Sequence, residues 1–576
     1  MSDTERQAYS IAIVGSGGAG VMTLGAVLLE VAARTGYYGS FSRLFGPQVR
    51  GGEAAALLTL STTAVEAAPD DYDCLVAIDW GHVDRFATEI SLAESNVIIA
   101  DPKQGAIPAS MRTAGSRMIE VSFGDIARGI KGARPNMVAL GVAGGLLGFQ
   151  RDVLADEACR RFRDQDASLL SGGLLALRAG YEFVPTLGVG PMLGLPAGKR
   201  DRWLMSGNEA VAIGALRGGV RFVAGYPITP ATEVVEWIAP RIEQVGGRFV
   251  QAEDELAAIS MALGASFGGV PSMSVTSGPG LSLMTESLGL ATAAEVPVVV
   301  VNVMRTGPST GIPTRTEQAD LNLAVYGAHG SAPRVVIAPT SVADCVETTR
   351  WAVEIAESRQ TPVIVLSDQL LGQTRVIIDP VAASSDHAKR AIASGESAAY
   401  RRYASTSSGV SPMSNPGSPG MAWVAEGLVH DESGTPSTAS LDHRHQLDKR
   451  RHKLEGFDYE ARWADVSGDG DIAVVTWGSS CGAVQEAVDR LREDALNIRM
   501  VSLKLLAPLP VTLLARTLAG VQAALVIELN HEGQLARVLK GGLDLPLRWS
   551  SFARPGPQAF RPAEVEHAII RWNHSL

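Results

Sequence analysis

The residues best suited to chemistry in this chain stand around a short loop, GYPITP, from Gly225 to Pro230. An apolar, strand-like run comes directly before the loop, and its two prolines exclude both a helix and a central strand. The sequence therefore predicts a rigid loop at the carboxyl end of a strand. Open α/β sheets bind ligands at that end, and Thr229 would offer a hydroxyl group there.

Three acidic residues follow at the start of an Ala-rich apolar helix. The segment is QAEDELAAI and contains Glu253, Asp254 and Glu255. Acids at a helix start are favourable for dipole reasons alone, so caps without a chemical role are one interpretation. Burial in an apolar site raises the pKa of a carboxyl group, which suits a side chain that must hold or share a proton. We therefore expect one of the three to be functional, and their spacing leaves all three open.

A third segment, from Ser274 to Leu321, predicts a strand, a Ser-Gly-Pro-Gly turn, a helix and a long apolar strand. Arg305 follows that strand, and the polar loop GPSTGIPTRTEQADL comes next. An arginine at a strand end is commonly a solvated surface charge. Its planar guanidinium group also suits a carboxylate, and strand ends are where this class of sheet keeps its site.

GYPITP and GPSTGIPTRTEQADL together resemble the α subunits of the 2-oxoacid:ferredoxin oxidoreductases, most closely the 2-oxoglutarate type with a γ domain fused in front. The resemblance extends over nearly the whole chain. It implies that the middle of the chain is the pyrimidine-binding half of a thiamine diphosphate enzyme, in which a carboxyl group contacts the aminopyrimidine ring. The family pattern makes Glu255 that group, with Tyr226, Pro227 and Ile228 as further cofactor contacts.

The same resemblance implies how a 2-oxoacid substrate is bound. Thr229 would lie beside the reacting carbon, and Arg305 would bind the substrate carboxylate. Arg315, in the loop after Arg305, would bind the second carboxylate of a dicarboxylic 2-oxoacid, and Thr310 of the same loop would contact the substrate.

GSGGAG, close to the N-terminus, lies between a predicted strand and a helix that begins near Val21, as in a phosphate-binding turn. A clean acid for a ribose hydroxyl group is missing at the end of the next strand, and the resemblance implies a γ-type domain associated with coenzyme A. Arg50, in FGPQVRGGE, would bind a phosphate or a neighbouring subunit, although Gln48 stands where the family usually has an acid. Glycines that only pack are the alternative interpretation. The glycines that would contact the ligand are Gly15, Gly17, Gly18 and Gly20.

We expect no metal site on this chain. A Gly-Asp-Gly run at 468–470, with Asn497 behind it, imitates the magnesium motif of thiamine enzymes, but it precedes a strand and predicts a turn. The resemblance implies that the metal motif lies on a separate β subunit. His443, His445 and His452 stand among arginine and lysine residues that repel a cation, which favours a solvated or interface helix.

Composition indicates the class of protein. A chain of 576 residues is too long to fold around a single hydrophobic core. Its 46% apolar residues, with 61 Gly and 30 Pro, suit a multidomain α/β fold. A net charge of −11 argues against nucleic acid as a partner. The chain has no apolar run long enough to cross a membrane, and its N-terminus does not resemble a signal peptide. We therefore expect a cytoplasmic protein. Four cysteines lie too far apart in sequence to hold an iron–sulfur cluster and are expected to be buried: Cys74, Cys159, Cys345 and Cys481.

The pattern of strands, helices and linkers divides the chain into five parts. We expect a γ-type domain with an open parallel sheet, a linker, a doubly wound pyrimidine-binding domain, an irregular insert, and an α/β domain like the C-terminal domain of transketolase. Their ranges are 1–185, 186–205, 206–375, 376–460 and 461–576. The last part contains the family's VIELN-x-x-GQL run, Val526 to Leu535.

The resemblance implies an enzyme that is active only with a β subunit carrying Mg²⁺, the diphosphate contacts and a [4Fe-4S] cluster. The complex, a dimer of αβ pairs, would reversibly convert 2-oxoglutarate and coenzyme A to succinyl-CoA and CO2 and reduce ferredoxin. Pyruvate, branched-chain and aryl 2-oxoacids are alternative substrates. A non-catalytic nucleotide- or coenzyme-A-binding subunit is the other class considered, and Thr229, Glu255 and Arg305 argue against it.

Overall fold

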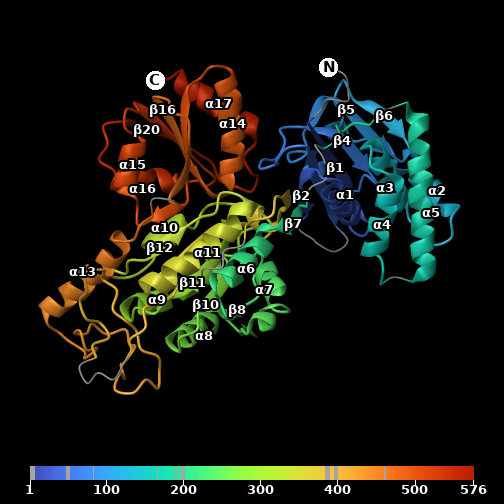
Figure 1. The fold of residues 1–576 in the computed structure, drawn as a ribbon. Helices are drawn as coiled ribbons and strands as arrows, with labels where there is room; N and C mark the ends of the chain where they lie inside the picture. The colour runs from blue at the N-terminus through green and yellow to red at the C-terminus, as the bar shows by residue number, and fades with distance from the viewer. Residues whose placement is uncertain are drawn as a thin grey trace. The chain divides into compact units, whose positions relative to one another are not determined.

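The computed structural model describes residues 7–46, 52–81, 83–164, 166–188, 191–194, 196, 201–382, 389–394, 400–459 and 462–576. Arg50 and Gln48 lie outside the described residues. The chain forms two compact units, one of residues 1–205 and 373–380 and one of residues 206–372 and 381–576 (Figure 1). The predicted multidomain α/β class is confirmed, and the five-part division stays a prediction.

The first unit is built on an eight-stranded sheet in the order β6-β5-β4-β1-β3-β2-β14-β7. The strands are β1 (Ala8–Ser16), β2 (Tyr38–Phe45), β3 (Glu53–Ser61), β4 (Tyr72–Ala77), β5 (Leu92–Ala100), β6 (Arg117–Glu120), β7 (Trp203–Ser206) and β14 (Arg375–Ile378). Strands β1, β4, β5 and β6 are parallel, but β3 pairs antiparallel with both β1 and β2. The strands predicted from sequence, now β1, β4 and β5, are parallel as expected, and the sheet as a whole is mixed because of β2 and β3. The short connection from β2 to β3 leaves no room for a crossover, so the two strands pair as a hairpin.

Helices cover this sheet, and small residues let two of them pack closely. The helices are α1 (Val21–Thr35), α2 (Phe123–Arg128), α3 (Pro135–Leu146), α4 (Arg151–Arg161) and α5 (Ala167–Phe183). A Cβ at Gly141 of α3 would lie 2.0 Å from the Leu177 carbonyl oxygen of α5, and a Cβ at Gly180 would lie 2.1 Å from the Val138 carbonyl oxygen. The small-residue run of α3 is therefore explained by helix packing.

The second unit contains a seven-stranded sheet in the order β18-β12-β13-β11-β10-β8-β9. Its parallel strands are β8 (Phe222–Gly225), β9 (Arg248–Gln251), β10 (Ser272–Thr276), β11 (Val298–Met304), β12 (Val335–Ile337) and β13 (Pro362–Asp368). The helices around it are α6 (Gly207–Gly218), α7 (Thr232–Ile238), α8 (Glu255–Phe267), α9 (Gly278–Ala293), α10 (Leu321–Tyr326), α11 (Val342–Arg359) and α12 (Gln369–Gln373). Helices on a parallel sheet bury both faces, which is why β10, β11 and β13 are buried throughout.

A five-stranded sheet completes this unit, in the order β15-β17-β16-β19-β20. Its strands are β15 (Ala464–Ser467), β16 (Ile472–Trp477), β17 (Ile498–Leu503), β19 (Ala523–Glu528) and β20 (Arg548–Ala553), with helices α14 (Cys481–Glu493), α15 (Val511–Thr517), α16 (Gln534–Gly542) and α17 (Pro562–Asn573). The run IRMVSLKLL, residues 498–506, would suit a single strand by its apolar pattern but divides in two. Its first part is β17, and its second part, β18 (Leu505–Ala507), pairs antiparallel with β12 of the seven-stranded sheet. The Gly-Asp-Gly run lies in the turn between β15 and β16.

The insert between β14 and β15 packs on the N-terminal edge of the seven-stranded sheet. Its helix, α13 (Ser440–Glu455), and the loops before it (orange in Figure 1) lie against the end of α9 and the turn that precedes β11. Lys449 Nζ is 2.6 Å from Glu295 Oε1, and Lys453 Nζ is 2.9 Å from Glu295 Oε2, with all three side chains buried. The charged helix was predicted to be solvated or at an interface. Its three histidines are exposed, but its lysines are buried because Glu295 neutralises them.

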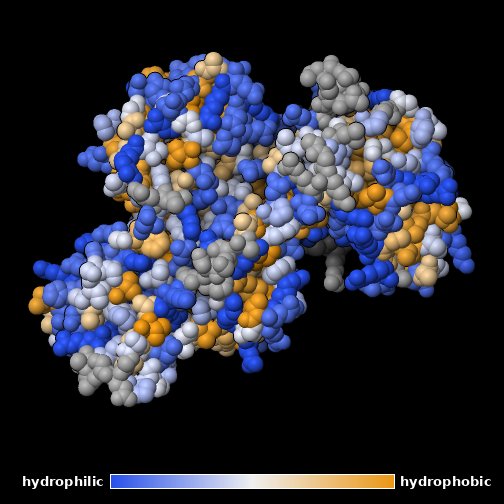
Figure 2. All heavy atoms as spheres, in the orientation of Figure 1, coloured by the Kyte–Doolittle hydropathy of each residue, from blue (hydrophilic) through white to orange (hydrophobic). Residues whose placement is uncertain are grey.

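The surface and the cysteines also bear on the predictions. Among the helices of the described residues, none combines the length and the apolar character needed to span a bilayer. Figure 2 shows apolar side chains at the surface over α5, where Leu169 and Leu175 are exposed. All four cysteines are free thiols, and three of them are buried as predicted, while Cys159 is half-buried.

Candidate functional site

Four neighbouring parallel strands bring the predicted site residues to one edge of the seven-stranded sheet. The strands are β9, β8, β10 and β11, and their carboxyl ends meet at the same edge. Glu255 follows β9, Thr229 follows β8, Gly280 follows β10 and Arg305 follows β11. This is the edge at which α/β sheets of this kind bind ligands.

The loop after β8 is fixed by two side chains from elsewhere in the chain. Asn208, fully buried at the start of α6, donates from Nδ2 to the Pro230 carbonyl oxygen at 3.0 Å. Arg305 donates from Nη1 to the Thr229 carbonyl oxygen at 2.7 Å. Tyr226 and Thr229 are exposed. The structure thus joins Thr229 and Arg305 directly and leaves the threonine side chain accessible.

The three rival acids have different environments. Glu253 is exposed, and Asp254 caps α8, accepting the Ala257 backbone N–H at 2.7 Å through Oδ1. Glu255 is the first residue of the helix and is only 6% exposed. Within the described ranges, no donor reaches the Glu255 carboxylate. A buried carboxylate without a partner fits an aminopyrimidine ring, whose nitrogen would supply the missing contact, because buried polar groups are normally paired.

The Ser-Gly-Pro-Gly turn at the start of α9 receives two carboxylates. A Cβ on Gly280 would lie 2.6 Å from Glu255 Oε1 and 2.1 Å from Thr276 Oγ1. A Cβ on Gly278 would lie 2.8 Å from Asp320 Oδ2. Both glycines are therefore required by close approach, and the turn lies between the two acids.

Replacing Gly280 with alanine is expected to lower catalytic activity at least about tenfold, because the new methyl group displaces Glu255. Gly289→Ala, later in the same helix, is the matched control, since a Cβ there meets nothing within 4 Å. Alanine in a helix interior is favoured over glycine by about 1 kcal/mol, so the control is expected to keep its activity and melt slightly higher. Turnover and thermal melting of both variants test this. Equal activity in the two variants would contradict the close contact.

Asp320 and Asn302 belong to this site and were missed from sequence. Asn302, fully buried in β11, donates from Nδ2 to Asp320 Oδ2 at 2.9 Å. Burial raises the pKa of Asp320, while the Asn302 hydrogen bond and the nearby Arg305 charge oppose that shift. Asp320 was missed because it directly precedes α10, and an acid at that position is normally interpreted as a helix cap.

Arg305 is buried with part of its guanidinium group unpaired. Its side chain is 7% exposed, and its Nε has no acceptor within the described chain. Burial lowers the pKa of Arg305, and Asp320 counteracts that shift. An unpaired donor on a buried guanidinium group fits a carboxylate ligand.

The loop after Arg305 folds back on itself. Thr306 N–H donates to the Arg315 carbonyl oxygen at 3.0 Å, and Ile312 N–H donates to the Thr306 carbonyl oxygen at 3.0 Å. Gly311 has φ +56°, and a Cβ there would lie 1.7 Å from the Thr306 carbonyl oxygen. The structure thus holds Arg315 beside Arg305 through the backbone, while Thr310 is exposed in the loop.

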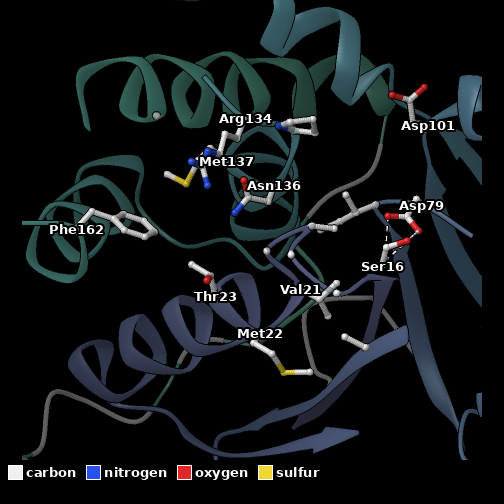
Figure 3. A pocket seen from close by; sticks show the side chains of 18 of the residues that line it. Ser16, Val21, Met22, Thr23, Asp79, Asp101, Arg134, Asn136, Met137 and Phe162 are labelled. Carbon is white, nitrogen blue, oxygen red and sulfur yellow. Dashed lines mark hydrogen bonds between the residues drawn. The ribbon is translucent and has the colours of Figure 1, made fainter. Parts of the chain in front are cut away.

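A second candidate site, a cavity of about 550 Å³, lies in the first unit (Figure 3). Gly17, Gly18 and Gly20 line it, whereas Gly15 lies in β1 outside the lining. Helices α1 and α3 both begin at the cavity, and Arg134 stands at the start of α3. Two helix N-termini and a cation suit an anionic ligand.

Asp79 holds the glycine-rich loop in place. Ser16 donates to its carboxylate from the backbone N–H at 3.0 Å and from Oγ at 2.7 Å (Figure 3). Gly81 N–H donates to the same carboxylate at 2.9 Å. This acid, at the end of the strand beside β1, is therefore occupied by the protein itself. The arrangement disfavours a dinucleotide whose ribose needs a free carboxylate.

Known families match all three sheets. Residues 213–449 match the family described as pyruvate flavodoxin/ferredoxin oxidoreductase, thiamine diP-binding. Residues 10–183 match pyruvate ferredoxin/flavodoxin oxidoreductase, and residues 470–565 match pyruvate:ferredoxin oxidoreductase core domain II.

Similar proteins span the whole chain. The 2-oxoglutarate:ferredoxin oxidoreductase from Magnetococcus marinus, solved with 2-oxoglutarate, coenzyme A and succinyl-CoA bound, is 31% identical with a TM-score of 0.90 over 98% of this chain and 100% of that chain. The 2-oxoglutarate synthase subunit KorA of Methanothermobacter thermautotrophicus is 34% identical over 65% of this chain and 99% of its own length. The 2-oxoacid:ferredoxin oxidoreductase subunit alpha of a Sulfolobus species is 30% identical over 97% of this chain and 96% of its own. This chain belongs to the α subunits of the 2-oxoacid:ferredoxin oxidoreductases and carries their thiamine diphosphate-binding domain.

Proposed function

We propose that this chain is the α subunit, with a fused γ domain, of a 2-oxoglutarate:ferredoxin oxidoreductase. The complex converts 2-oxoglutarate and coenzyme A to succinyl-CoA and CO2 and reduces ferredoxin, and the reaction is reversible. The observation that carries the proposal is the buried Glu255 carboxylate, which has no partner among the described residues, at the same sheet edge as Arg305, whose Nε lacks an acceptor among them. The substrate is supported by the similar Magnetococcus marinus structure, with its bound 2-oxoglutarate, and by the KorA relatives.

Each residue has a defined task in this proposal. Bound thiamine diphosphate supplies the nucleophilic carbon for the substrate carbonyl group. Glu255 holds a proton at the aminopyrimidine ring, and the loop Tyr226–Pro227–Ile228 borders that ring. Arg305 binds the substrate carboxylate with its free guanidinium donors, and Thr229 donates to the keto oxygen. Arg315 and Thr310 bind the distal carboxylate of 2-oxoglutarate.

A β subunit completes the site in this proposal. It supplies Mg²⁺, the diphosphate contacts and a [4Fe-4S] cluster, passes electrons to ferredoxin, and forms an (αβ)2 assembly in the cytoplasm. Support comes from the surface beside Glu255, where Leu256 and Met261 of α8 and Leu283 of α9 are 51%, 41% and 49% exposed. Apolar side chains exposed next to a buried catalytic acid suit a protein interface.

We assign coenzyme A to the cavity of the first unit, with its phosphates at Gly17, Gly18 and Gly20. Arg134→Gln is then expected to raise the KM for coenzyme A at least about tenfold at unchanged kcat, because a hydrogen bond to a charged group contributes about 1.5–3 kcal/mol. Arg128→Gln is the control, since Arg128 is also exposed and pairs with Asp125 outside the cavity. An unchanged KM in the Arg134 variant would remove coenzyme A from this cavity.

The test of the proposed function is co-expression with a β-type partner. The cluster-loaded, thiamine-bound complex is assayed for coenzyme-A-dependent reduction of a viologen dye with 2-oxoglutarate and with pyruvate. Activity with 2-oxoglutarate supports the proposal. A preference for pyruvate, a branched-chain or an aryl 2-oxoacid overturns the substrate, and inactivity with every oxoacid leaves a non-catalytic coenzyme-A-binding subunit.

A further inference from the structure

The C-terminal sheet has a topological switch point, the position at which open α/β sheets normally bind ligands. Strands β16 and β19 are parallel neighbours, and the chain leaves β16 through α14 toward β17, on its other side. The carboxyl ends of β16 and β19 therefore border the point where the strand order reverses, which is the ligand-binding position in such sheets.

Gln318 lies at this switch point, against the carboxyl ends of β16 and β19. Its Nε2 donates to the Trp477 carbonyl oxygen at the end of β16 at 2.7 Å. Its Oε1 accepts from Ser480 Oγ and from Leu529 N–H, each at 2.8 Å, and its own backbone N–H donates to the Leu529 carbonyl oxygen at 2.7 Å. The side chain is fully buried. A glutamine from the segment that follows the Arg305 loop thus fills this position with protein contacts.

The surrounding residues are shaped for this contact. Gly478 has φ +61°, and a Cβ there would lie 2.5 Å from Gln318 Nε2. Gln534 donates from Nε2 to the Ala319 carbonyl oxygen at 2.8 Å and accepts the Asn322 N–H at 2.8 Å. The run VIELN-x-x-GQL is therefore hydrogen-bonded to the segment that follows the Arg305 loop.

Glu528 of the same run secures Gln534 indirectly. Its carboxylate accepts hydrogen bonds from the N–H groups of Leu535 at 2.8 Å and Ala536 at 3.0 Å. These N–H groups lie in the first turn of α16, where the helix itself provides no acceptor. Burial raises the pKa of Glu528, and these hydrogen bonds oppose the shift. The start of α16 is thereby held where Gln534 reaches Ala319 and Asn322, in the segment that follows the loop.

We propose that the C-terminal sheet positions the substrate loop, Arg305 to Arg315, through Gln318. Only three positions separate Gln318 from Arg315, whose carbonyl oxygen accepts the N–H next to Arg305. Gln318 is thus a positioning residue that sets the affinity for the 2-oxoacid without contacting it. The inference rests on the proposed function in assigning Arg305 and Arg315 to the oxoacid.

The first test uses steady-state kinetics of the αβ complex with 2-oxoglutarate. Gln318→Met removes the side-chain hydrogen bonds at similar volume and is expected to raise KM about tenfold while kcat changes less than about threefold. Thr476→Val is the matched control, because Thr476 Oγ1 donates to the Ile527 carbonyl oxygen at 2.8 Å within the same sheet and does not touch the loop. A KM for Gln318→Met equal to that of the control overturns the inference.

Gln318→Glu adds a pH readout. Its ionised carboxylate repels the Trp477 carbonyl oxygen, whereas the protonated form restores a donor and an acceptor. The KM of this variant relative to wild type is therefore expected to fall toward one as pH is lowered. A ratio independent of pH would contradict the role of the Nε2 donor.

Hydrogen exchange separates this inference from the proposed function, because it needs no activity. The N–H groups of Thr306, Ile312 and Arg315 are bonded within the loop. In Gln318→Met they are expected to exchange at least about tenfold faster, while the N–H groups of β16 and β19 stay protected. Unchanged loop exchange overturns the positioning by Gln318. If the wild-type complex lacks oxoacid activity and exchange is still faster in Gln318→Met, the positioning of the loop by Gln318 is supported and the proposed substrate is wrong.

Discussion

Replacing Glu255 with glutamine is expected to lower turnover of the complex at least about 100-fold, because general acid–base contributions of this kind amount to about 10²–10⁴. Glutamine keeps the size of the side chain and its place against Gly280, but it has no carboxyl proton to share with the aminopyrimidine ring. The expected loss is therefore in kcat, with the fold intact. Stopped-flow or steady-state viologen reduction, together with the thermal midpoint, measures both.

The neighbouring acid provides the control for this result. Glu253 is two residues away and exposed, so Glu253→Gln is expected to retain at least about half of the activity. Asp254 is unsuitable as a control, since its side chain caps α8 and its loss costs about 1 kcal/mol of stability. If Glu253→Gln lost its activity and Glu255→Gln kept it, our assignment of the catalytic carboxyl group to Glu255 would be wrong.

Glu295→Gln is expected to destabilise the second unit by about 3–5 kcal/mol, because it leaves two buried ammonium groups without their anion. Lys449 and Lys453 both bond Glu295, and Arg402 donates to its carbonyl oxygen at 2.8 Å. Glu286→Gln, on the exposed side of α9, is the control and is expected to change stability by less than about 0.5 kcal/mol. Calorimetric unfolding of both variants at neutral pH gives the comparison.

Stability should also depend on pH through the same carboxyl group. Burial by itself raises the pKa of Glu295, but Lys453, Lys449 and Arg402 outweigh it and hold the pKa below its ordinary value. The unfolded chain therefore takes up this proton at a higher pH than the folded chain. Its contribution is fully present above about pH 5 and declines as pH falls below the unfolded pKa of about 4.3. The wild type is expected to lose stability more steeply than Glu295→Gln between about pH 5 and pH 3, and parallel slopes would contradict the ion pair.

The place of the insert follows from the same ion pairs. Glu295 precedes β11, whereas Arg305 follows it, so the two lie at opposite edges of the sheet. The insert residues that bond Glu295 therefore pack away from the candidate active site. The insert therefore contributes to the stability of the domain. Its charged and turn-forming residues gave no sign in sequence that Glu295 would be their partner.

Local sequence patterns identified most of the strands and the loops that bear the site. The apolar runs at β8, β10, β11 and β13 and the prolines of GYPITP were sufficient, because strand burial and proline geometry act within a few residues. The hairpin of β2 and β3 was missed although the residues that connect them, 46–52, include a Gly-Pro and a Gly-Gly pair, which are turn signals, and are too few for a crossover. The split of IRMVSLKLL between two sheets was also missed, since both halves satisfy the same alternation.

The sequence by itself determined the order of elements, the family and the three acids among which a catalytic carboxyl group had to be sought. The family resemblance already singled out Glu255, and the tertiary structure added that Glu255 is buried whereas Glu253 and Asp254 are exposed, because burial depends on what packs against a helix start and not on its residues. The tertiary structure also decided the partners of Asp320, Gln318 and the α13 lysines. Gln318 meets Trp477 and Leu529, and Lys453 meets Glu295, across more than 150 residues of chain. Contacts at that separation arise from the folding of whole domains onto each other, and no local spacing encodes them.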